Sequence, residues 1–171
     1  MVLSSRMLLT NAAPAENLLF SSPAKELKLP EIQRSIFEDA YDEIEIIGFP
    51  VSASPYELLI VKGRGNTFVK DLPNCNGKTV KMVGYLISTK HVPTKRGDMF
   101  FGTWIDVHGQ YFDTAHFQDC LKSYPFKGGG CYVLLGTVKI DYNFPTITIQ
   151  KMDKLPFMAD PRYRDQKDYH T

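Results

Sequence analysis

The sequence has few cysteines, no long apolar run and almost no net charge. Its three cysteines, Cys75, Cys120 and Cys131, are odd in number, widely spaced and outside any CxxC pair. This usage predicts a reducing compartment and argues against both a disulfide framework and a zinc site. No stretch reaches the roughly 20 apolar residues of a membrane-spanning helix. We therefore expect a cytoplasmic chain that holds no metal ion or other cofactor and does not enter a membrane.

The balance of charge excludes a polycation. Lys and Arg number 20 against 19 Asp and Glu, so the formal net charge is +1. Such a chain offers no bulk attraction to a polyanion, and any binding of nucleic acid has to come from local basic patches. With 43% hydrophobic residues, the 171-residue chain is long enough for one folded domain with an appendage.

The first residues, MVLSSRMLLTNAAPA, look like a secretory signal peptide but lack its central element. Arg6 interrupts an apolar run that is already shorter than the roughly 7–15 residues a signal peptide needs. We interpret them as part of a loosely ordered lead-in, rich in Ala, Ser and Pro, over residues 1–34.

Residues 35–60 predict a helical arm or linker. Ser35 and Glu38 match a capping box, in which each side chain satisfies a backbone N–H at the start of a helix. Apolar residues recur at helical spacing behind this box until Gly48, which ends the helix. A second short helix is expected from Ser54, with a proline in its first turn.

From Lys78 onward, β-branched and aromatic segments alternate with turns. The first strand, TVKMVGYLISTK, contains Gly84, at which it can bend, and the basic loop HVPTKRGD follows. The remaining elements are strands near 99–107 and 110–117, a short helix QDCLKSY, and the strands CYVLLGTVKI and TITIQKM. Residues 156–171 form a polar C-terminal tail that we expect to be frayed.

This order of elements is that of an OB-fold, a mainly β, five-stranded Greek-key barrel with a helix between strands 3 and 4. We expect the OB-fold domain over residues 72–155, preceded by the small helical arm. An SH3-like barrel is the alternative, but it lacks the helix between its third and fourth strands. The sequence therefore favours the OB-fold.

Three segments resemble one known family. They are DEIEIIGFPVSASPYELL, LPNCNGKTVKMVGYLISTKHVPTKRGDMFFGTWIDVHG and FDTAHFQDCLKSYPFKGGGCYVLLGTVKIDYNFPTITIQKM. These segments are similar to the C-terminal OB-fold region of the bacterial replicative DNA polymerase III alpha subunit and the stretch before it, over roughly residues 16–155. The resemblance implies a non-catalytic module that binds single-stranded DNA, because the polymerase's catalytic palm has no room in 171 residues.

Residues 95–117 hold six aromatic side chains, including the only tryptophan. An OB-fold binds nucleic acid across strands 2 and 3 and on the loops that join strands 1–2 and 4–5. Because neighbouring residues of a strand face opposite ways, Phe101 and Thr103 share one face and Trp104 lies on the other. The resembling family has an aliphatic residue in place of Trp104, which implies that this ring packs inward. In strand 3, alternation predicts one face with Phe112, Thr114 and His116 and an opposite face with Asp113, Ala115 and Phe117. An additional residue, Tyr111, indicates a bulge at the start of strand 3, which leaves this assignment of faces open.

The expected nucleic-acid site combines aromatic rings with nearby cations. A base stacked on a ring contributes only about 1–3 kcal/mol, so phosphate contacts have to supply the remaining affinity. The candidate residues are Lys90, His91, Lys95, Arg96, Phe101, Thr103, Phe112, Thr114, His116 and Lys139.

Other motifs carry weaker interpretations. QRSIF is similar to the peptide by which polymerases hold a sliding clamp, but Ser35 and Phe37 already serve as helix cap and helix face. NCNGKT lacks the first glycine of a phosphate-binding loop, and the four histidines show no metal-binding spacing. Asp106 is interpreted as a turn cap rather than a catalytic carboxylate. We therefore expect no enzyme.

A protein-interaction module is the rival hypothesis. In it the barrel and the arm dock other replisome subunits, and the aromatic hairpin is merely buried. The near-zero net charge keeps this alternative open. An enzymatic role, such as the nucleotidyl transfer of the parent polymerase, is a more distant possibility.

Overall fold

The computed structural model describes residues 35–61, 65–95 and 97–163. The expected lead-in, Arg96 and the last part of the expected tail lie outside the described residues. The elements are α1 (Ile36–Ile47), η1 (Val69–Asn74), β1 (Thr79–Thr94), β2 (Gly97–Ile105), β3 (Tyr111–Phe117), α2 (Gln118–Ser123), β4 (Gly130–Asp141) and β5 (Phe144–Lys154). Within these ranges no helix is long and apolar enough to cross a membrane.

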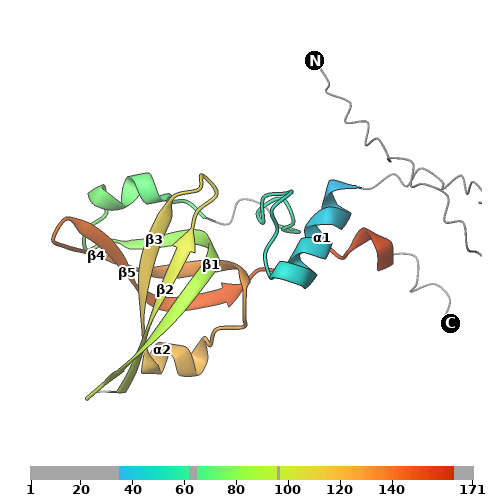
Figure 1. The fold of residues 1–171 in the computed structure, drawn as a ribbon. Helices are drawn as coiled ribbons and strands as arrows, with labels where there is room; N and C mark the ends of the chain where they lie inside the picture. The colour runs from blue at the N-terminus through green and yellow to red at the C-terminus, as the bar shows by residue number, and fades with distance from the viewer. Residues whose placement is uncertain (1–34, 62–64, 96, 164–171) are drawn as a thin grey trace, which may run out of the picture. The chain divides into compact units, whose positions relative to one another are not determined.

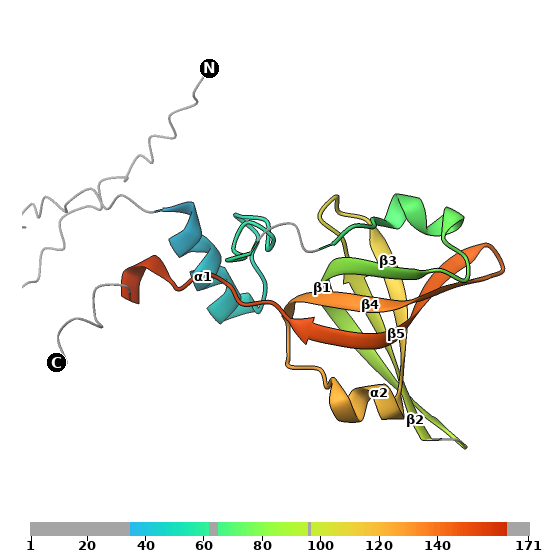
Figure 2. The same cartoon turned by 180° about the vertical axis from the view of Figure 1, so that it is seen from behind.

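The five strands close into a barrel in the order β1-β2-β3-β5-β4 (Figure 1). Neighbouring strands are antiparallel, except that β3 and β5 run parallel. Both views show α2 at one end of the barrel and the 3-10 helix η1 at the opposite end (Figures 1 and 2). This arrangement is the OB-fold that the element order predicted, and α2, between β3 and β4, distinguishes it from an SH3-like barrel.

Alternate residues of the strands fill the barrel interior. Its largest fully buried side chains are Trp104 and Tyr132. Gly84 makes room for this core, because a Cβ there would lie 2.7 Å from Cζ of Phe112. Gly84 was expected to bend β1, but the register irregularity falls between Leu86 and Ser88. Gly84 therefore serves close packing, and the β-bulge of β1 lies three residues further on, at Ile87.

β1 and β2 continue as a hairpin where a loop was predicted. β1 pairs with β4 through Thr79–Leu86, whereas its pairing with β2 extends to Thr94. Most of HVPTKRGD is therefore paired strand, as far as the pair formed by Thr94 and Gly97. Beyond Leu86, β1 no longer pairs with β4, and among the described residues no other strand takes that place. This edge tolerates Pro93, because proline has no N–H to donate to a neighbouring strand.

β3 begins at Tyr111 without the bulge that the sequence indicated. The pairing of β2 with β3 shows no register shift, and the irregularities lie in the β1–β2 and β4–β5 pairs instead. Asp106 holds the turn before β3, because its Oδ1 accepts hydrogen bonds from the N–H groups of His108 and Gln110, both at 2.9 Å. The interpretation of Asp106 as a turn cap is confirmed.

α1 is the helix that the capping box predicted. Oε2 of Glu38 accepts the N–H of Ser35 at 3.1 Å, and Gly48 ends the helix with a left-handed φ of 88°. The second helix expected from Ser54 is wrong, since residues 55–58 form only a turn. The chain then extends, because Leu59 forms a β-bridge with a residue of the tail.

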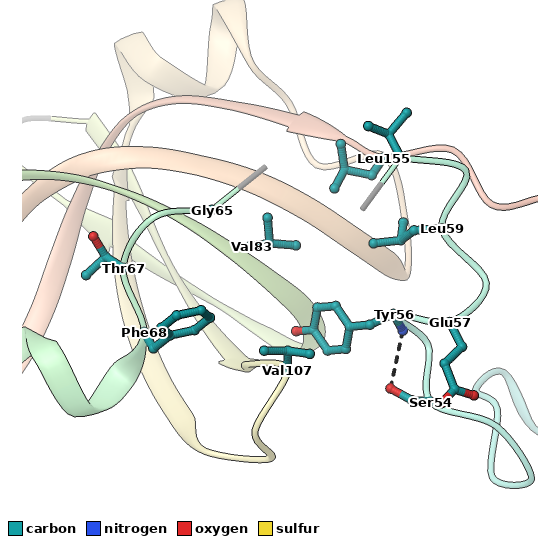
Figure 3. Close-up of a pocket in the computed structure, with 11 residues that line it drawn as sticks. Ser54, Tyr56, Glu57, Leu59, Gly65, Thr67, Phe68, Val83, Val107 and Leu155 are labelled. Carbon is teal, nitrogen blue, oxygen red and sulfur yellow. Dashed lines mark hydrogen bonds between the residues drawn. The ribbon is translucent and has the colours of Figure 1, made fainter. Parts of the chain in front are cut away.

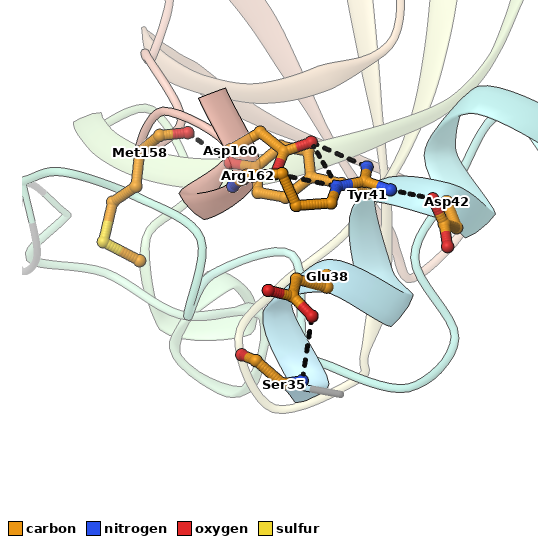
Figure 4. Close-up of polar contacts among 7 residues, drawn as sticks. All are labelled: Ser35, Glu38, Tyr41, Asp42, Met158, Asp160 and Arg162. Carbon is orange, nitrogen blue, oxygen red and sulfur yellow. Dashed lines mark hydrogen bonds and ion pairs between the residues drawn. The ribbon is translucent and has the colours of Figure 1, made fainter. Parts of the chain in front are cut away.

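Residues 156–163 pack on the arm instead of forming a frayed tail. The Tyr41 hydroxyl donates a hydrogen bond to the Met158 carbonyl, and Arg162 forms an ion pair with Asp42 at 2.5 Å (Figure 4). A small core of buried side chains lies beneath these contacts: Ala40, Ala53 and Leu58, with Phe37, Tyr41, Ile44 and Phe157 against it. The arm is therefore built from both ends of the described chain.

Candidate nucleic-acid interface

Two rows of paired residues cross the outer face of β1, β2 and β3. In the first row, Lys90 of β1 pairs with Phe101 of β2, which pairs with Ala115 of β3. In the second row, Thr103 pairs with Asp113. Directly paired residues project from the same side of a sheet, so these five side chains share one surface.

The burial of their neighbours establishes that this surface is the outer one. Trp104 is fully buried and Phe112 is 2% exposed, and both belong to the barrel core. Thr103 and Asp113 are adjacent to them in sequence and therefore point the opposite way. The inward orientation expected for Trp104 is confirmed.

Lys139 joins the second row from the far side of the barrel. It is exposed on β4 and pairs with Thr146 of β5, which in turn pairs with Asp113. Because β5 lies between them, Lys139 is separated from Asp113 by one strand. The structure thus places Lys90, Phe101 and Thr103 on one outer face of β1 and β2, and it places Lys139 on the outside of β4, two strands beyond β3.

Three of the expected site residues lie inside the barrel instead. Phe112, Thr114 and His116 share a face, as strand alternation predicted, but they are 2%, 0% and 0% exposed. The unshifted register places Phe112 opposite the buried Trp104, so this face of β3 has to be the interior one. Their assignment as surface contacts to nucleic acid is corrected: in this conformation all three pack in the core.

These buried groups form a small polar network. The indole N–H of Trp104 donates to Oγ1 of Thr114 at 2.7 Å, and His116 Nε2 lies 2.7 Å from the same oxygen. The Thr114 hydroxyl donates to the Gly102 carbonyl at 3.2 Å. Burial lowers the pKa of His116 to about 4, so its ring is neutral near pH 7. Its Nδ1 has no hydrogen-bond partner among the described residues.

The hairpin separates two basic residues, Lys90 and His91, that the sequence grouped together. His91 faces away from Lys90, since adjacent residues of β1 alternate. The imidazole stacks on Phe100, with ring centroids 4.6 Å apart, and its Nε2 lies 3.0 Å from Oδ1 of Asp98. His91 is therefore not brought together with Lys90 and Phe101.

The two hairpin turns that an OB-fold uses for binding both carry exposed side chains. Lys95 is exposed at the β1–β2 turn, while its expected partner Arg96 lies outside the described residues. At the β4–β5 turn, Tyr142 is fully exposed and Phe144 is 55% exposed. Sequence reasoning treated DYNFP as a simple connector, although two aromatic residues in a binding loop were an available signal.

Two more rings on the outer face were missed. Tyr111 pairs with Ile105 and is 64% exposed, and Phe117 pairs with Met99 and is 50% exposed. Strand alternation predicts that Phe117 and Phe112 lie on opposite faces of β3. The expected site used the face of Phe112, which is the interior one. Within the described part of the chain, the outer face of β2 and β3 therefore offers three rings: Phe101, Tyr111 and Phe117.

A pocket of about 470 Å³ lies elsewhere, between the turn after α1 and the barrel (Figure 3). Tyr56 fixes this turn to the barrel, because its hydroxyl accepts the Tyr85 N–H at 3.0 Å and donates to the Ile105 carbonyl. Among the described residues that line the pocket, only Glu57 is charged. An apolar lining with one carboxylate does not suit a polyanion.

The described residues offer little reactive chemistry. No group of three or more His, Cys, Asp or Glu side chains among them could hold a metal ion. Burial raises the pKa of the Cys131 thiol to about 12, so this cysteine stays protonated. A thiol in that state is a poor nucleophile.

The strand order, the parallel β3–β5 pair and the position of α2 make the described barrel an OB-fold. No protein-family model matches the sequence, and no curated protein matches it.

Several solved structures are similar to this chain at low identity. A small single-stranded DNA-binding protein from Streptomyces coelicolor shows 12% identity and a TM-score of 0.39, over 46% of this chain and 93% of that one. The N-terminal domain of PriB from Thermoanaerobacter tencongensis shows 13% identity and a TM-score of 0.38, over 46% and 96%. The second OB-fold domain of replication protein A from Methanococcus maripaludis shows 16% identity and a TM-score of 0.33, over 49% and 87%. Likenesses this weak carry no argument about what this chain binds.

Proposed function

We propose that the chain is a non-catalytic module that binds single-stranded DNA across the outer face of β1, β2 and β3. The observation that carries this proposal is the convergence of Lys90, Phe101 and Thr103 on one surface, beside the exposed rings of Tyr111 and Phe117. Each base stacked on a ring contributes about 1–3 kcal/mol, so three rings support useful affinity where one would not.

Local cations supply the contacts to phosphate. Lys90 lies on the face itself, Lys95 lies at the tip of the hairpin, and Lys139 lies on β4. The net charge is only +1, so binding depends on these positions rather than on the mean charge of the protein. Affinity should then fall steeply as salt increases, because neutralised phosphates release counterions.

The resemblance to the DNA polymerase III alpha subunit supports a more specific role. We propose that the module holds the single-stranded template of a replicative polymerase in the cytoplasm. The three similar segments include the hairpin MFFGTWIDVHG, which supplies Phe101 and Thr103. A sliding-clamp contact through QRSIF is disfavoured, because clamp peptides bind extended whereas Phe37 lies in α1 and packs on the core of the arm.

A titration tests the function. Fluorescently labelled oligo-dT of about 15 nucleotides is titrated with the protein at two salt concentrations, and the fluorescence anisotropy gives Kd. We expect saturable binding and a slope of log K against log salt near −0.7 for each phosphate contacted. A double-stranded oligonucleotide of equal length is the control. If neither salt concentration gives binding to oligo-dT, the proposed function is wrong.

One observation favours a second candidate function, the docking of other proteins on the arm. Ile46, Phe49 and Val51 are 81%, 50% and 65% exposed at the end of α1, which is unusual for side chains so apolar. The second half of α1 also carries Asp42, Glu43 and Glu45, so a docking partner would present apolar and basic groups. Replacing Ile46 and Phe49 with Ser should abolish such docking while oligo-dT binding stays unchanged.

A further inference from the structure

Asp113 is an unexpected residue in the middle of a face proposed to bind a polyanion. It lies on β3 between Thr103 of β2 and Thr146 of β5, and it is half-buried. Its Oδ1 accepts a hydrogen bond from the Thr103 hydroxyl at 2.9 Å. Among the described residues no cation forms an ion pair with it; Lys139 stands in the same row but beyond Thr146.

This carboxylate has unused capacity to accept hydrogen bonds. An ionised carboxylate offers about four lone-pair sites, and the Thr103 hydroxyl occupies one of them. Asp106 provides the contrast, because the N–H groups of Val69, His108 and Gln110 occupy its two oxygens. The bond from Thr103 also restricts rotation of the Asp113 side chain.

The charge of Asp113 decides which part of a nucleic acid can lie over it. A phosphate would be repelled, since two like charges a few ångströms apart repel in any dielectric. A base edge with an amino group would instead donate a hydrogen bond, as cytosine N4 does to Asp and Glu. Thymine and uracil present a carbonyl oxygen at the same place, which the carboxylate repels.

The neighbouring rings place base edges within reach. Tyr111 lies two residues before Asp113 on the same face of β3, at a spacing of roughly 7 Å. Phe101 is the diagonal neighbour on β2, at roughly 7–8 Å. A base stacked on either ring extends over about that distance, so its polar edge reaches the carboxylate.

We propose that Asp113 is a specificity-determining residue that makes this face prefer bases with an exocyclic amino group, cytosine foremost, over thymine and uracil. The inference rests on the proposed binding of single-stranded DNA. The preference is modest, because it comes from one contact on a surface otherwise built for stacking and phosphate binding.

Oligo-dC and oligo-dU of equal length are the decisive probes. Their bases have the same ring size and no methyl group, and differ at position 4 as amino group and carbonyl. At pH 8, where cytosine is unprotonated, we expect the full chain to bind oligo-dC about fivefold more tightly than oligo-dU. In the Asp113→Asn variant, whose amide both donates and accepts, the two affinities should become equal.

Two further variants control for charge and for orientation. Asp119→Asn makes the same change of net charge on α2 and should leave the ratio of the two affinities as in the wild type. Thr103→Val removes the hydroxyl that orients Asp113 and should reduce the ratio while keeping a side chain of the same shape. Thermal melts of all variants verify that the barrel is folded.

The outcomes separate this inference from the proposed function. Binding of both oligonucleotides with equal affinity by the wild type overturns the role of Asp113 and leaves the function standing. An equal gain for both in Asp113→Asn also overturns it, because the carboxylate would then act only by repulsion. If the wild type binds neither oligonucleotide at low salt, the proposed function fails and the inference fails with it.

Discussion

Trp104 and Phe101 of β2 illustrate at the residue scale how one crowded strand serves two purposes. Trp104 is fully buried, so Trp104→Ala should lower the free energy of unfolding by about 3–5 kcal/mol. Phe101 lies on the outer face, so Phe101→Ala should weaken binding of oligo-dT by about 1–3 kcal/mol and barely shift Tm. Thermal melts and anisotropy titrations on both variants measure the two effects.

Phe49→Ala is the matched control for the Phe101 variant. Phe49 is 50% exposed and belongs to the arm, so its removal should not affect oligonucleotide binding. Loss of stability without loss of binding in Phe101→Ala would show that the hairpin rings are all structural.

His116 should make stability depend on pH. The native pKa is about 4, whereas an unfolded histidine titrates near 6.5. Above pH 6.5 both states are neutral and stability is complete; as pH falls from 6.5 to 4, only the unfolded chain gains the proton. The free energy of unfolding should fall by about 3 kcal/mol over this window.

Urea titrations at a series of pH values measure this dependence. His116→Leu should flatten the dependence of the free energy of unfolding on pH between pH 6.5 and 4, whatever the absolute stability of the variant. An unaltered slope in His116→Leu would mean that other groups dominate the acid response.

At the residue scale, the sequence predicted which side chains share a face of a strand better than it predicted whether that face is interior or exterior. Alternation correctly placed Phe112, Thr114 and His116 together, and the aliphatic residue of the resembling family correctly implied an inward Trp104. Strand alternation alone could not identify the interior face of β3, because the interior face depends on how β3 pairs with the other strands of the barrel. The bulge expected at Tyr111, which the structure does not show, left the face assignment of β3 open, because a shift of one residue exchanges the two faces.

At the scale of elements, the β1–β2 hairpin is the part that reaches beyond the barrel. Changing Lys95 and Arg96 together to Ala should weaken binding to all single-stranded sequences about equally. For each phosphate that the variant no longer neutralises, the slope of log K against log salt should flatten by roughly 0.7. Salt titrations with oligo-dT and a mixed-sequence oligonucleotide measure the change.

Lys78 and Lys81 provide the matched control at the other end of β1. Both side chains are exposed, and changing both to Ala also removes two positive charges. If this control flattens the salt slope as much as the hairpin variant does, the effect is one of net charge and the turn has no special role.

Local signals predicted some elements and failed for others. The capping box of α1 is complete within four residues, so the sequence alone was sufficient. The sequence before residues 55–58 has an equally good signal for the start of a helix. The helix does not continue, because Leu59 forms a β-bridge with Phe157, which is distant in sequence. Likewise HVPTKRGD has the composition of a loop, and its pairing follows from the extension of β2 beside it.

At the scale of the whole molecule, the segment after β5 completes the arm. A chain that ends at Leu155 should lack the packing of Phe157 on the arm, worth about 1.5–3 kcal/mol, and the hydrogen bond from Tyr41 to the Met158 carbonyl, worth about 0.5–1.5 kcal/mol. At about 2–4 °C per kcal/mol, Tm should fall by roughly 4–18 °C. Calorimetry on this chain, with a chain that ends at Tyr163 as control, measures the difference.

The control chain should melt like the full-length protein and bind oligo-dT equally well. Equal Tm values for all three chains would mean that the arm and its closing segment contribute nothing to the stability of the barrel.

The hydrogen bond between Tyr41 and Met158, 117 residues apart, has a consequence for synthesis on the ribosome. Translation proceeds at roughly 5–20 residues per second, so roughly 6–23 seconds pass between the two residues. During that interval the apolar side of α1 emerges without the segment that covers it. The nascent arm is therefore open to chaperones until the barrel has been synthesised, and it can close only after residues 156–163 have left the exit tunnel.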